Sequence, residues 1–74
     1  MEIPNGKYRH FKGGEYQVLG VALHSETGEE MVVYQALYGD RSLWVRPAAM
    51  WLETVEYKGR KVHRFTRVEE EAMR

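Results

Sequence analysis

Cysteine is absent from this 74-residue sequence, which excludes disulfides and thiolate metal sites. Net charge is absent as well, because eleven basic residues balance eleven acidic ones, so long-range attraction to nucleic acid or an anionic membrane is weak. The longest apolar run, residues 47–52, is far shorter than the roughly 20 residues that span a bilayer. The first residues carry no basic or apolar stretch typical of a secretory signal. These absences predict a cytoplasmic protein that does not act at a membrane.

The length of the chain allows one hydrophobic core and no second domain. We expect a single domain over residues 1–68, followed by a C-terminal tail at residues 69–74 that contains three consecutive glutamates. The segment from Lys58 to Arg67 carries five basic residues and no acidic one, a pattern that is usually a solvated face.

Turn signals divide the sequence into short segments rich in Val, Tyr, Leu, Phe and Trp. The clearest turn is Gly13-Gly14, between two such segments, and others follow around Gly28, Gly39 and Gly59. The spacing predicts strands over residues 6–11, 15–24, 31–38, 42–46, 53–57 and 61–67. Gly20 predicts a bulge or bend in the second strand, and Pro47 predicts a short helical turn that ends near Trp51.

This pattern predicts an all-β fold, most simply a small SH3-like antiparallel barrel of five or six short strands, with an OB-type barrel as the alternative. Apolar positions on consistent strand faces predict the core. These positions are Phe11, Val18, Val21, Val33, Leu37, Leu43, Val45 and Leu52.

Several ordered motifs resemble one known family. They are Gly6-x-Tyr8-x-His10-Phe11-Lys12-Gly13, His24-Ser25-Glu26-Thr27, Tyr38-Gly39 and Leu43-Trp44-Val45-Arg46-Pro47-x-x-Met50. Together they closely resemble the bacterial family DUF1653, over nearly the whole chain. The resemblance implies a small SH3-like β-barrel with no established activity, substrate or cofactor.

The residues with the strongest functional pattern are Tyr38, Trp44 and Arg46, together with the loop His24-Ser25-Glu26-Thr27. Trp44 and Arg46 are two positions apart on one strand and therefore share a face. An aromatic ring beside a guanidinium is suited to stacking a base or holding an anionic group. The alternative is structural: Arg46 covers the core over Trp44, and Ser25 and Thr27 only shape a turn.

Three classes of function remain open from the sequence. The leading hypothesis is a binding module that recognises an anionic or aromatic group on a nucleic acid, a nucleotide or a peptide. The second is a structural or adaptor domain that acts as a homodimer, rather than a monomer, or pairs an edge strand with a partner. The third and weakest is an acid–base enzyme that uses His24 and Glu26. The histidines His10, His24 and His63 have no recognised ligand spacing, and we expect neither a metal nor a cofactor.

Overall fold

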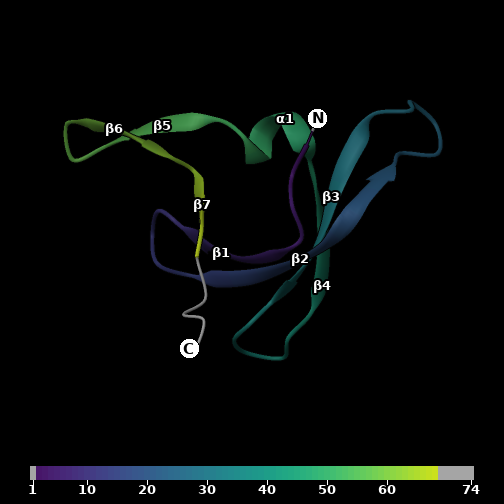
Figure 1. Cartoon of the computed structure of the whole chain (residues 1–74), viewed down its shortest axis with the longest axis horizontal. Helices are drawn as coiled ribbons and strands as arrows, with labels where there is room; N and C mark the ends of the chain where they lie inside the picture. The colour runs from purple at the N-terminus through teal and green to yellow at the C-terminus, as the bar shows by residue number, and fades with distance from the viewer. Residues whose placement is uncertain (1, 69–74) are drawn as a thin grey trace.

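The computed structural model of the chain describes residues 2–68 (Figure 1). Its elements are β1 (Gly6–His10), β2 (Glu15–Leu23), β3 (Glu30–Ala36), β4 (Leu43–Pro47), α1 (Ala48–Trp51), β5 (Thr54–Tyr57), β6 (Arg60–His63) and β7 (Phe65–Arg67). Within residues 2–68, no helix is long and apolar enough to cross a membrane. The predicted tail at residues 69–74 lies outside the described residues.

Five strands form one antiparallel sheet in the order β4-β3-β2-β1-β7, and β5 and β6 form a separate two-stranded hairpin. The all-β prediction is therefore confirmed, including the one short helix after Pro47. The prediction of a closed barrel is not met among residues 2–68, because β4 and β7 are the two edges of the sheet and do not pair with each other. The strongly bent sheet stays open, with α1 and the β5–β6 hairpin above its concave side (Figure 1).

Local chemistry explains the breaks between the strands. The Gly13-Gly14 turn joins β1 to β2, with Gly13 at a φ of 112° and its N–H donating to the His10 carbonyl. The register of β2 against β3 shifts between Val18 and Gly20, which is the bulge that Gly20 predicted. The last predicted strand is divided at Arg64, whose N–H donates to the Glu53 carbonyl and whose carbonyl accepts from the Phe11 N–H.

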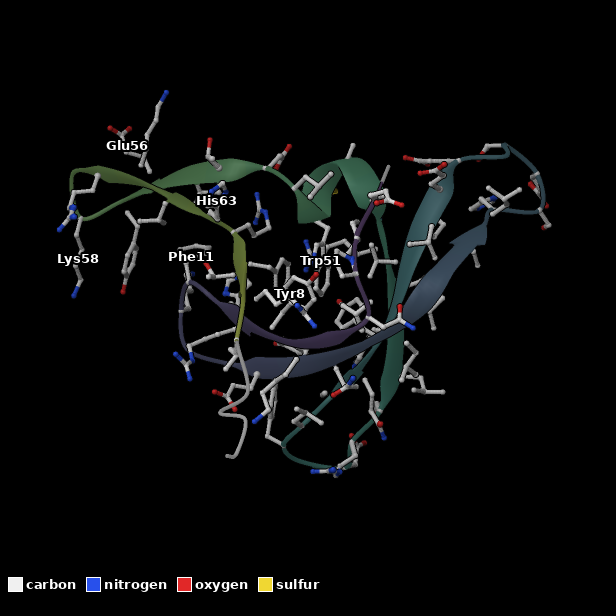
Figure 2. The ribbon with its side chains drawn as sticks, in the orientation of Figure 1. Tyr8, Phe11, Trp51, Glu56, Lys58 and His63 are labelled. Atoms are coloured by element: carbon white, nitrogen blue, oxygen red, sulfur yellow. The ribbon has the colours of Figure 1, made fainter. Side chains whose placement is uncertain are left out.

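The core lies on the concave side of the sheet, under α1. Its members are Ile3, Tyr8, Val18, Val32, Tyr34, Ala36, Ala48, Trp51 and Phe65. Trp51 is central: its ring stacks on Phe65 with centroids 3.7 Å apart and meets the edge of Tyr8 at 5.5 Å. Figure 2 shows Trp51 and Tyr8 together in the space between the helix and the sheet.

Of the eight residues assigned to the core from the sequence, Val18 alone belongs to it, four are exposed, and Phe11, Val33 and Leu37 are half-buried. Val18 is fully buried, but Leu43 and Val45 are 63% and 59% exposed, and Val21 and Leu52 are exposed as well. In the register of β4 with β3, Leu43 and Val45 lie opposite Gln35 and Val33, on the outer face. Strand β4 therefore turns its other face, that of Trp44 and Arg46, to the concave side.

Candidate functional site

A pocket of about 290 Å³ opens on the concave side, at the end of the sheet where β3 turns into β4. Four aromatic side chains, one acidic residue and two small residues line it. They are Tyr16, Tyr34, Tyr38, Trp44, Asp40, Ala36 and Gly39. We call this the aromatic pocket. Two of the residues predicted as a site from the sequence, Tyr38 and Trp44, therefore do come together.

Strand register places these rings side by side. Tyr16 on β2 pairs with Ala36 on β3, and Tyr34 on β3 pairs with Trp44 on β4. Directly paired residues share a face of an antiparallel sheet, so the three rings project to the same side around the small Ala36. Tyr38 follows two residues after Ala36 and continues that face past the end of the strand. Trp44 is 56% exposed and Tyr38 is 54% exposed, so both rings present area to a ligand.

The rings are set at steep angles to one another. The Tyr16 and Tyr34 ring centroids are 5.4 Å apart at an interplanar angle of 83°, and those of Tyr16 and Tyr38 are 5.6 Å apart at 71°. The hydroxyls of Tyr16 and Tyr38 form a hydrogen bond of 2.7 Å. These edge-to-face contacts are favourable and hold the walls of the pocket in place without a ligand.

Burial of Tyr16 changes its ionisation. Desolvation, followed by the hydrogen bond with Tyr38, raises the pKa of Tyr16 to about 12. The phenol is neutral at physiological pH, as an ordinary tyrosine is, and the shift moves its ionisation further into the alkaline range.

Asp40 lies on the tight turn between β3 and β4. Gly39 and Arg41 on either side have φ values of 60° and 59°, and the Arg41 N–H donates to the Tyr38 carbonyl. One carboxylate oxygen of Asp40 accepts hydrogen bonds from the N–H and the hydroxyl of Ser42. The turn thus fixes a negative charge at the rim of the aromatic pocket.

Arg46 shares the face of Trp44, as the sequence predicts, but it is not part of the lining of the aromatic pocket. Its guanidinium lies over the Phe65 ring, 5.6 Å from the centroid. Its Nε atom is buried without a hydrogen-bond partner among residues 2–68. Arg46 therefore covers the core, as the structural alternative expects, but it does so over Phe65 rather than over Trp44.

The loop His24-Ser25-Glu26-Thr27 is separated from this pocket. It joins β2 to β3, whereas the Tyr38–Ser42 turn joins β3 to β4, so the two lie at opposite ends of β3 (Figure 1). Six residue steps along a strand correspond to about 20 Å. All four loop residues are exposed, and the Nδ1 atom of His24 accepts a hydrogen bond from the Glu26 N–H. This loop forms a turn, and the predicted seven-residue site divides in two.

Sequence reasoning missed Tyr16, Tyr34 and Asp40 as members of the pocket. A signal for one of them was present: Tyr34 lies four positions before Tyr38, and residues an even number of positions apart share a face of a strand. Tyr16 depends on pairing across β2 and β3, and that pairing is set by the bulge at Gly20.

A second pocket, of about 380 Å³, lies between β1, β7 and the β5–β6 hairpin. Its lining includes His10, Phe11, Tyr57, His63 and Arg67, and none of the residues of the aromatic pocket. The Lys58 and His63 side chains that Figure 2 labels belong to this hairpin. The basic segment from Lys58 to Arg67 therefore borders a different pocket from the one that Trp44 lines.

Acidification should destabilise the domain through His10. Desolvation, with smaller contributions from Arg46, Arg64 and Lys12, lowers the pKa of His10 below its ordinary value of 6.5. The unfolded chain therefore binds a proton near pH 6.5 while the folded protein does not, so this stability is present above pH 6.5 and is lost as the pH falls through the folded pKa. When urea unfolding is measured at several pH values, His10→Gln should lose less stability on acidification than the control His63→Gln. Equal losses in the two variants would contradict the assignment.

Comparison with known proteins places the chain in a family. The sequence profile of DUF1653, described as a protein of unknown function, matches residues 6–67. The chain belongs to the DUF1653 family. A crystal structure of a DUF1653 protein from Bordetella bronchiseptica is similar to it, with 36% sequence identity, a TM-score of 0.82, and coverage of 95% of this chain and 96% of that chain. No curated protein matches the sequence. The resemblance found in the motifs is thus confirmed, and membership of DUF1653 assigns no activity.

Proposed function

We propose that this DUF1653 chain is a small binding module and that the aromatic pocket is its binding site. The observation that carries the proposal is the convergence of four aromatic side chains from β2, β3, β4 and the adjoining turn on one pocket, with Trp44 and Tyr38 more than half exposed. Large aromatic side chains that remain exposed together are typical of binding sites. A volume of about 290 Å³ suits a group the size of one amino-acid side chain.

A peptide fits this pocket better than a nucleic acid or a nucleotide. Binding of a phosphate backbone is carried by Lys and Arg contacts. The charged residue in the lining is Asp40, and the nearby Arg46 guanidinium lies over Phe65 instead. The net charge of zero adds no attraction for a polyanion. The rings thus support the part of the sequence-based prediction that rests on Trp44 and Tyr38, and recognition of an anion through Arg46 has less support.

Replacing Trp44 by alanine should weaken ligand binding about tenfold or more, because a ring contact contributes on the order of 1 kcal/mol or more. The same change should leave the fold intact, since the indole is largely exposed. Amide chemical-shift mapping against pooled short peptides identifies the ligand, and titration of the variant measures the loss. Leu43→Ala is the matched control, because Leu43 is on the same strand and faces the other side.

Three results would count against the proposal. Shifts that avoid the aromatic pocket would remove it as the site. Nucleotides or short RNAs that shift the pocket residues more than peptides do would overturn the choice of ligand. A Trp44→Ala protein that is unfolded would show that the indole has a structural role.

One observation favours a second candidate function, homodimerisation. The outer face of the sheet exposes Leu43 and Val45 next to Val33, as the dimer hypothesis requires. Sedimentation at increasing protein concentration should then show a dimer that Val45→Glu dissociates. A monomer at every concentration would exclude this candidate.

A further inference from the structure

The ligand class of the aromatic pocket follows from the angles between its rings. Tyr16 stands at 83° to Tyr34 and at 71° to Tyr38, so the rings form the walls of a box rather than the two sides of a slot. A flat group gains most between parallel rings, and it meets only one wall of a box face-on. A rounded group can contact rings that stand at steep angles to one another at the same time. The pocket shape therefore favours a compact, roughly spherical group over a planar one.

The charge of the lining sets the sign of that group. Ring faces carry negative potential and attract cations, and Asp40 adds a full negative charge at the rim. Among residues 2–68, the lining of the aromatic pocket contains no Lys, Arg or His.

Hydrogen bonding decides between kinds of cation. A primary ammonium has three N–H donors, and each loses a water partner when the group enters a ring-lined pocket. The Tyr16 and Tyr38 hydroxyls are bonded to each other, and Asp40 Oδ1 accepts from Ser42. The acceptors that remain are the other lone pairs of those hydroxyls and Asp40 Oδ2, whereas the ring faces that form most of the lining offer none. A fully alkylated ammonium has no N–H to satisfy, and its methyl groups bring apolar surface to the rings.

The geometry points to an alkylated ammonium group, such as a trimethylated lysine side chain on a peptide, as the ligand of the box formed by Tyr16, Tyr34, Tyr38 and Trp44 with Asp40 at its rim. This inference rests on the proposed binding function and names its ligand class. These rings can bind a cation without the guanidinium of Arg46. That guanidinium lies over Phe65, and its positive charge repels a cation in the pocket.

Choline and 3,3-dimethyl-1-butanol test the charge requirement, because the two probes have the same shape and differ in the positive charge. Chemical-shift titrations of the whole chain should place choline at the four rings with about tenfold higher affinity than the neutral probe. A short peptide with trimethyllysine should likewise bind more tightly than the same peptide with unmodified lysine.

Three variants sharpen this test. Trp44→Ala should remove most of the choline binding, and Asp40→Asn, which keeps the shape of the turn, should reduce it severalfold. Leu43→Ala should leave it unchanged. Arg46→Gln should strengthen choline binding at low salt, whereas it would weaken the binding of an anion.

The outcomes separate this inference from the proposed function. Equal binding of choline and its neutral analogue at the rings, or tighter binding of an aromatic side chain there, would overturn the inference that the ligand is a cation. The pocket would still be the binding site. Weaker choline binding in Arg46→Gln would also overturn it. If neither these probes nor the pooled peptides shift the pocket residues, the inference and the proposed function both fail.

Discussion

A Trp51→Ala protein should be largely unfolded at physiological temperature. Trp51 is 2% exposed, stacks on Phe65 at 3.7 Å with an interplanar angle of 2°, and contacts Tyr34 at 4.9 Å. Removing a buried tryptophan costs about 3–5 kcal/mol, because the apolar surface is lost and a cavity remains. A domain of this size has a total stability near the low end of about 5–15 kcal/mol. Near-UV circular dichroism and thermal melts measure the loss.

Val45→Ala provides the contrast for this experiment. Val45 is apolar and lies in the middle of β4, yet it is exposed on the outer face. Its truncation in dilute solution, where a dimer would dissociate, should change the stability by less than about 1 kcal/mol. A Val45→Ala protein that melts as early as Trp51→Ala would contradict the assignment of the concave face as the core.

Much of the fold is local and was predictable. The Gly13-Gly14 turn, the bulge at Gly20 and the helical turn after Pro47 each depend on the backbone preference of one or two residues. The strand positions followed from β-branched and aromatic composition between turns. Closure into a barrel depends on pairing between edge strands, which no local preference specifies.

The orientation of the sheet could not be read from β4 alone. Leu43 and Val45 alternate with Trp44 and Arg46, and an aliphatic face is the usual core face, since arginine is rarely buried. In the structure the aliphatic face of β4 is exposed instead. Strand β3 is apolar on both sides, and α1 places Trp51 against the side of Val32 and Tyr34, so that side becomes the core. The choice between two apolar faces was thus decided by a tertiary contact with the helix.

The candidate site was predictable where its residues share a strand or a hairpin. Tyr38 and Trp44 flank one short turn, and they line the same pocket. The sequence does not give the strand register that would place the His24–Thr27 loop relative to Tyr38 and Trp44. In the structure the length of β3 separates this loop from the aromatic pocket. Tyr16 enters the pocket through a pairing between strands that is set by a bulge, so its role depends on the whole sheet.

Alkaline pH should destabilise the domain through Tyr16. The folded pKa of this phenol is about 12, whereas the pKa in the unfolded chain is near its ordinary value of 10.0. Between these two values the unfolded chain loses a proton that the folded protein keeps, so the stability present below pH 10 falls as the pH rises and levels off above the folded pKa. This pKa difference of about two units corresponds to a loss of roughly 2–3 kcal/mol in the free energy of unfolding. Burial also raises the pKa of Tyr8, which adds to the loss of stability at alkaline pH.

Tyr16→Phe isolates this contribution. At neutral pH the variant should lose about 1 kcal/mol, because the hydrogen bond between the Tyr16 and Tyr38 hydroxyls is gone. Above pH 10 its stability should fall less steeply than that of the natural sequence, so the two urea-unfolding midpoints should approach each other and then cross. Tyr57→Phe, which changes a tyrosine outside the aromatic pocket, should retain the steep alkaline loss. Parallel stability curves for Tyr16→Phe and the natural sequence would show that folding does not raise the pKa of Tyr16.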